Sequence, residues 1–147
     1  NMTDILASIG LAQLERYPEI LAKRREFVEL YDSLLRPYGI EPLAHYGSCF
    51  SSSSHLYMVR VPGVNERLRN DIIGMMGAAG IACNVHYKPL PMLTAYKDLG
   101  FEMDHYPNSI GQYENEITLP LHTLLQSEDL AYIASTLIDL MRKVLAG

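Results

Sequence analysis

The chain has 147 residues, of which 48% are hydrophobic and 20% charged, as expected of one folded domain with a sizeable core. The formal net charge is −5, and no basic stripe is interleaved with aromatic residues, so we expect no nucleic-acid partner. No apolar run approaches the length of a membrane span, and two cysteines are too few for a disulfide framework, so we expect a reduced, cytoplasmic protein.

The chain begins with Asn1 and Met2 and enters a helix almost at once. This start predicts a piece of a longer protein, or a tag remnant before Met2. Thr3 or Asp4 can cap the first helix, which we expect to end near Arg16. The helix is apolar almost all round, and such helices are normally buried, often against another domain or subunit.

The next segments predict a second helix, a loop and a strand. Pro18 suits the first turn of a helix, and Pro37 and Gly39 end it. Residues 40–54 are loop-like. Residues 55–61 are rich in aromatic and β-branched side chains and are followed by a Pro-Gly pair, which indicates a strand.

The second half predicts two more strands among helices. Asn65 can cap a helix that runs to about Ala79, and Gly80 suits its C-terminal end. The apolar residues 81–85 then predict a strand. The remaining elements are a short helix over residues 92–99, a helical piece over residues 107–114, a strand over residues 116–119 and a last helix from Ser127. This order predicts an α+β fold with a small three-stranded sheet backed by helices, in a single domain of residues 1–147.

Residues 84–91 form the strongest site candidate. Pro89 and Pro91 each fix φ at about −65° and remove a backbone donor, so the predicted strand ends in a stiff loop. Polar side chains gather where strand becomes loop, a place where ligands are often held. These side chains belong to Asn84, His86, Tyr87 and Lys88. On spacing alone, a hydrogen-bonded structural histidine beside a half-buried tyrosine remains the other interpretation.

Other constellations predict no chemistry. The five histidines and two cysteines lack the spacing of metal ligands, so no metal site is expected. The serines at 51–54 precede His55 without the Gly-x-Ser-x-Gly pattern of a nucleophile elbow. Glu114 and Glu116 flank a strand start, and nothing in the sequence forces two acids together, so we expect both to be solvated. No catalytic residue is predicted.

Seven blocks, in a specific order, cover nearly the whole chain. They are residues 2–16, Arg24-Arg25 with Tyr31, residues 53–57, residues 84–91, Tyr96 with Leu99-Gly100, Pro107-Asn108, and residues 116–122. In this order the blocks resemble the C-terminal half of the DegT/DnrJ/StrS-type sugar aminotransferases. Each block alone is a weak signal, whereas the ordered set is specific.

The resemblance implies the C-terminal small domain of a longer, homodimeric transaminase of the aspartate-aminotransferase fold (fold type I). Such enzymes use pyridoxal phosphate as an electron sink and move an amino group, usually from glutamate, onto a nucleotide-linked keto sugar. The two helices of residues 1–38 would join this domain to a missing large domain. The family's cofactor-holding lysine lies in that large domain, and none of Lys23, Lys88, Lys97 and Lys143 matches its setting, so the chain alone should be inactive.

The resemblance also implies site residues. His86 and Tyr87 match the family's pair at the substrate cleft, where a histidine can hydrogen-bond a sugar hydroxyl or a diphosphate. Lys88 could attract the diphosphate, and His122 matches a loop near the cleft. Asn1 matches the region from which an asparagine reaches the partner's cofactor phosphate, although it sits where a basic residue is usual. A cofactor-binding residue, a variant and a cloning remnant all stay open for Asn1.

Two other interpretations stay open. The chain could be a free-standing small-molecule binding or regulatory module with an α+β sheet, or part of a nonenzymatic homologue that lost its lysine. The apolar first helix favours the aminotransferase interpretation, because a free-standing module would leave that helix exposed.

Overall fold

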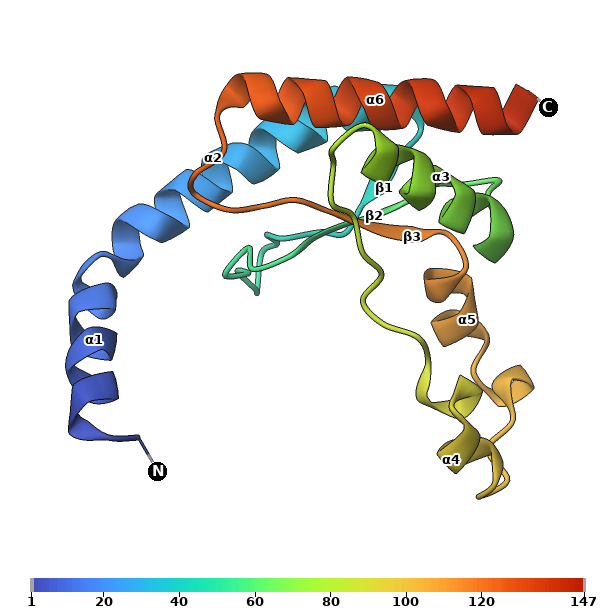
Figure 1. The fold of residues 1–147 in the computed structure, drawn as a ribbon, viewed down its shortest axis with the longest axis horizontal. Coiled ribbons are helices and arrows are strands. Elements are labelled where there is room, and N and C mark those ends of the chain that lie inside the picture. The colour runs from blue at the N-terminus through green and yellow to red at the C-terminus, as the bar shows by residue number, and fades with distance from the viewer. Residues whose placement is uncertain (1, 147) are drawn as a thin grey trace.

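A three-stranded antiparallel sheet lies at the centre of the computed structural model, which describes residues 2–146 (Figure 1). The strands are β1 (Glu41–Pro42), β2 (Tyr57–Arg60) and β3 (Glu116–Leu119). Their order is β1-β2-β3, so β2 is the central strand. Tyr57 pairs with Leu119 and Arg60 with Glu116 across β2 and β3. The predicted α+β class, with a small sheet backed by helices, is confirmed.

The larger helices cover this sheet on one side (Figure 1). The helices of residues 2–146 are α1 (Asp4–Glu15), α2 (Tyr17–Leu35), α3 (Glu66–Ala78), α4 (Thr94–Lys97), α5 (Pro107–Tyr113) and α6 (Ser127–Ala146). Three short 3-10 turns, η1 (Arg36–Tyr38), η2 (Leu90–Met92) and η3 (Met103–His105), lie between them. Helix α6 packs against both α2 and α3 on one side of the sheet (Figure 1). Within residues 2–146, none of the helices has the length and apolar character needed to cross a bilayer.

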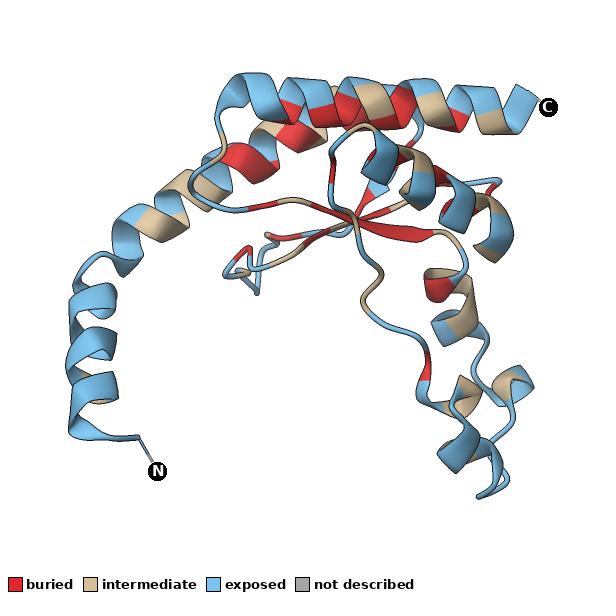
Figure 2. Ribbon diagram, viewed as in Figure 1, coloured by how far each residue is buried: buried red, intermediate tan, exposed pale blue. Residues whose placement is uncertain are grey.

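The hydrophobic core lies between the sheet and these three helices (Figure 2). Helix α2 contributes Phe27, Tyr31 and Leu35 at helical spacing, and each of these side chains is fully buried. Strand β2 alternates between buried and half-buried residues, whereas all four residues of β3 are buried. Both faces of β3 are therefore covered, and every side chain on this strand is shielded from solvent.

Helix α1 has no buried residue within this chain and is exposed along most of its length (Figure 2). The Thr3 side chain caps it by accepting from the backbone N–H of Leu6 at 3.4 Å, as predicted. The predicted burial of this helix is not found inside the chain, because α1 extends away from the sheet and packs mainly against the start of α2 (Figure 1). Its apolar side chains, including Ile5 at 74% exposure and Leu11 at 65%, face outward.

Two predictions about strands were wrong. Residues 81–85 do not form a strand, and only Asn84 pairs with the sheet, through an isolated bridge to Thr118. The reason is local: the backbone N–H of Val85 donates to the Asn84 side chain at 2.8 Å, and that of His86 donates to the Glu116 carboxylate at 2.9 Å. Side chains thus take the donors that a strand ladder would use. In exchange, the loop predicted at 40–54 contains the short edge strand β1.

The two thiols differ in burial, which predicts different reactivity. Burial raises the pKa of the Cys83 thiol to about 11, while Cys49 is exposed. At pH 8 a thiol with that pKa is about 0.1% thiolate, and the thiolate is the nucleophile. We expect iodoacetamide at pH 8 to alkylate Cys49 well before Cys83 in the folded chain, as followed by peptide mass spectrometry. Both should react alike in urea, and equal rates in the folded chain would contradict the burial of Cys83.

Candidate functional site

The segment that follows α3 contains the site candidates of residues 84–88, and it runs past the free edge of β3. Asn84 and Thr118 exchange two backbone hydrogen bonds: Asn84 N–H donates to Thr118 O at 3.2 Å, and Thr118 N–H donates to Asn84 O at 2.8 Å. This single bridge places His86 beside the side chains of β3. The strand predicted over residues 81–85 is therefore absent, and one pair of backbone hydrogen bonds, between Asn84 and Thr118, joins this segment to the sheet.

Three side chains make a closed set of hydrogen bonds at this edge. The backbone N–H of His86 donates to Oε2 of Glu116 at 2.9 Å. The hydroxyl of Thr118 donates to Oε1 of the same carboxylate at 2.5 Å. Nδ1 of His86 lies 2.8 Å from the Thr118 oxygen. One buried carboxylate thus holds His86 through its backbone directly and through its ring by way of Thr118.

Glu116 is buried, with an exposed fraction of 1%, so its predicted place on the surface was wrong. No local sequence pattern indicates this burial, because Glu116 is buried by the elements that cover both faces of β3. Thr118, which is 6% exposed, was likewise not singled out from the sequence. A Glu-x-Thr pair on a strand places both side chains on the same face, and that spacing could have indicated contact between them.

A buried arginine supports the same strand from α3. Arg69 has no exposed surface, and its Nη1 donates to the backbone oxygens of Tyr113 at 2.9 Å and Glu116 at 3.2 Å. Its guanidinium lies 4.7 Å from the centre of the Tyr113 ring, and Nη2 lies 3.9 Å from the Glu66 carboxylate. Arg69 therefore fixes the turn between α5 and β3, from which Glu116 projects.

Tyr87 and Lys88 lie on the outside of this segment. The Tyr87 ring meets the His86 ring edge to face, with 4.6 Å between ring centres, and the side chain is 75% exposed. Lys88 is exposed as well. His86 is half-buried, and the peptide bond between His86 and Tyr87 is cis. The structure thus brings His86 and Tyr87 together, with the tyrosine ring and Lys88 open to solvent.

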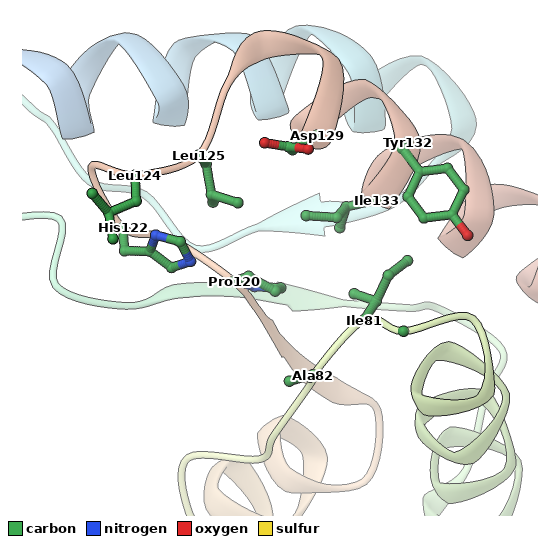
Figure 3. Close-up of a pocket in the computed structure, with 10 residues that line it drawn as sticks. Ile81, Ala82, Pro120, His122, Leu124, Leu125, Asp129, Tyr132 and Ile133 are labelled. Carbon is green, nitrogen blue, oxygen red and sulfur yellow. The ribbon is translucent and has the colours of Figure 1, made fainter.

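His122 belongs to a different hollow. It lines an open groove of about 720 Å³ between the segment after α3 and the start of α6 (Figure 3). Leu124 and Leu125 come from the loop before α6, and Tyr132 and Ile133 come from α6 itself (Figure 3). His86, Tyr87 and Lys88 do not line this groove. The chain by itself therefore does not bring His122 into the His86 cluster.

None of the four lysines among residues 2–146 has the setting of a residue that holds pyridoxal phosphate. Lys88, Lys97 and Lys143 are exposed, and Lys23 pairs with Glu26 at 3.3 Å on the outer face of α2. A lysine that holds this cofactor works from a desolvated pocket, and none of the four lies in one. The predicted phosphate contact, Asn1, lies outside the described residues.

Comparison with known proteins decides the family. Residues 1–138 match the sequence profile of the DegT/DnrJ/EryC1/StrS aminotransferase family. The chain belongs to this family.

Relatives of this family member include one protein with a solved structure and two transaminases. A "putative sugar aminotransferase" from Streptococcus pneumoniae, solved in its PMP form, is 53% identical with a TM-score of 0.96, over 99% of this chain and 37% of that one. The UDP-4-amino-4,6-dideoxy-N-acetyl-beta-L-altrosamine transaminase of Helicobacter pylori is 30% identical over 94% of this chain and 36% of that protein. The transaminase of the same name from Campylobacter jejuni is 26% identical over 100% of this chain and 39% of that protein. The chain thus spans less than two fifths of the length of each of these relatives.

Proposed function

We propose that this chain is the C-terminal small domain of a longer, pyridoxal-phosphate-dependent aminotransferase that acts on nucleotide-linked keto sugars. The observation that carries the proposal is the likeness to the Streptococcus pneumoniae protein, at 53% identity and a TM-score of 0.96 in the PMP form. The same protein has also been solved in a PLP form, at 54% identity. Glutamate as amino donor, a homodimer and a cytoplasmic location belong to the same proposal.

In this proposal the chain supplies substrate contacts rather than the reacting centre. Pyridoxal phosphate, held by the large domain, would supply the electron sink for amino transfer. Residues 1–38 would join the two domains, with the exposed apolar side chains of α1 against surfaces outside this chain. A free-standing binding module would leave α1 uncovered in water, which disfavours that alternative.

The predicted site residues have separate roles in this proposal. His86 would hydrogen-bond the substrate, and Tyr87 would lay its exposed ring against the sugar or the base. Lys88 would add charge attraction to the diphosphate. His122 would contribute from the groove beside α6 only if the large domain or the substrate spans the two places. Asn1 as a phosphate contact remains a prediction.

A substitution of His86 tests this assignment. In the full-length enzyme, we expect His86→Ala to lower kcat/KM for a UDP-linked keto sugar about tenfold, the loss expected from one hydrogen bond. Bound pyridoxal phosphate, measured by its absorbance after gel filtration, should stay at the wild-type level. His105→Ala is a matched control, since His105 is exposed and its side chain forms no hydrogen bond within residues 2–146. Equal loss of cofactor and of substrate use would remove His86 from the substrate site.

A further inference from the structure

The hydrogen bonds around Glu116 determine which way the Thr118 hydroxyl points. A carboxylate offers acceptors only, and a hydroxyl has a single hydrogen to donate. Both oxygens of the Glu116 carboxylate are engaged, Oε2 by the His86 backbone N–H and Oε1 by the Thr118 hydroxyl. The hydrogen of Thr118 is therefore used toward Glu116 at 2.5 Å.

The orientation of Thr118 in turn determines the proton on His86. Nδ1 of His86 lies 2.8 Å from the Thr118 oxygen, which has only lone pairs left to offer. A hydrogen bond at that distance needs a hydrogen on Nδ1. In a neutral imidazole with Nδ1–H, the other nitrogen, Nε2, carries a lone pair and acts as an acceptor.

The second ring nitrogen has no partner in the part of the chain that the structure describes. Within residues 2–146, the His86 side chain makes one hydrogen bond, and it is the bond of Nδ1 to Thr118. The His86 side chain is half-buried, and Tyr87 packs on its ring edge to face. Nε2 is thus the ring atom left for a ligand.

We propose that Thr118 and Glu116 are positioning residues that hold neutral His86 as the Nδ1–H tautomer, so that Nε2 accepts a hydrogen from a hydroxyl group of the sugar. This inference rests on the proposed function for its ligand, and on the three distances above for its tautomer. The tautomer distinguishes between two ligand groups that a histidine can bind, a sugar hydroxyl and a diphosphate. An acceptor at Nε2 suits a hydroxyl donor, whereas a deprotonated diphosphate offers only acceptor oxygens and would need a donor at Nε2.

The tautomer can be read directly from nitrogen chemical shifts. In full-length protein labelled with 15N-histidine, at a pH where His86 is neutral, two- and three-bond proton–nitrogen correlations distinguish a protonated ring nitrogen from an unprotonated one. The His86 signals are assigned by their disappearance in His86→Gln. We expect a protonated Nδ1 and an unprotonated Nε2 in the wild-type protein. A protonated Nε2 with an unprotonated Nδ1 would overturn the proposal.

Variants at position 118 test whether Thr118 sets this preference. Thr118→Val keeps the β-branched shape but removes the hydroxyl, so the Nδ1–H tautomer of His86 should no longer predominate over the Nε2–H tautomer. In Thr118→Ser, which keeps a hydroxyl, the Nδ1–H tautomer should still predominate. Retention of the wild-type tautomer in Thr118→Val would show that Thr118 does not position the ring. The wild-type spectrum remains a test of the tautomer even if Thr118→Val does not fold.

A kinetic measurement connects the tautomer to the ligand. In the active enzyme, Thr118→Val should raise KM for the UDP-linked keto sugar several-fold with kcat less affected, and Thr118→Ser should lie near the wild type. An unchanged KM in Thr118→Val would contradict the hydroxyl contact. The spectra do not depend on transamination, so a failure of the proposed function would leave the tautomer result standing, and the two failures can be told apart.

Discussion

The isolated chain of residues 1–147 will neither transfer an amino group nor form a borohydride-fixed adduct with pyridoxal phosphate at a single lysine. A lysine that holds this cofactor is activated by desolvation or by a neighbouring cation in a pocket. Lys88, Lys97 and Lys143 are exposed, and Lys23 is ion-paired with Glu26 on α2. None of these four lysines therefore has the desolvated setting in which such a bond is stable.

The measurement is peptide mass spectrometry after incubation with pyridoxal phosphate and reduction with borohydride. The full-length protein is the control, and we expect one modified lysine there, outside residues 1–147. Low and scattered labelling of several surface lysines in the isolated chain would agree with the prediction. One of the four lysines modified near completion, at cofactor concentrations that leave the others free, would contradict it.

The largest loss of stability is expected on removing the buried arginine of α3. Arg69→Ala should lower the free energy of unfolding by about 3 kcal/mol, because it leaves a cavity and deprives two buried backbone oxygens of a donor. Those oxygens belong to Tyr113 and Glu116, and the guanidinium also loses its place over the Tyr113 ring. Urea unfolding followed by circular dichroism measures the change.

A neighbouring arginine provides the matched control. Arg67 lies on the same helix and is exposed, so Arg67→Ala should change the free energy of unfolding by no more than about 0.5 kcal/mol. The two variants remove the same charge and the same side-chain length. Equal losses would mean that net charge or helix propensity, rather than the buried bonds of Arg69, decides the stability.

The sequence predicted those elements that local patterns determine. The helical spacing of apolar residues in α2 and α6, the capping by Asn65 and the strand over residues 116–119 all agree with the structure. Residues 81–85 were mispredicted because their apolar composition suits a strand, whereas the donors of Val85 and His86 are taken by side chains. Those acceptors come partly from residues far away in the sequence, and no local pattern shows them.

The sequence predicted the more exposed residues of the candidate site but not the buried residues that support them. The prolines at 89 and 91 marked the segment of His86 and Tyr87, and the structure places these two side chains together. Glu116 and Arg69 were not predicted, because charged residues are mostly exposed and a sequence does not show which strand is covered on both faces. Their burial follows from packing among α3, α5 and β3 rather than from their own neighbours in sequence.

The anchoring of His86 at the edge of β3 has a consequence for how such a domain can diversify. Every bond that fixes His86 comes from residues 84–86 and from Glu116 and Thr118. In the segment after His86, residues 87–112, only Pro89 is buried, and the backbone hydrogen bonds join residues that are close in sequence. Segments with little burial tolerate insertion and exchange. This stretch could therefore be replaced or lengthened in related proteins, altering what is admitted to the site while the histidine keeps its position.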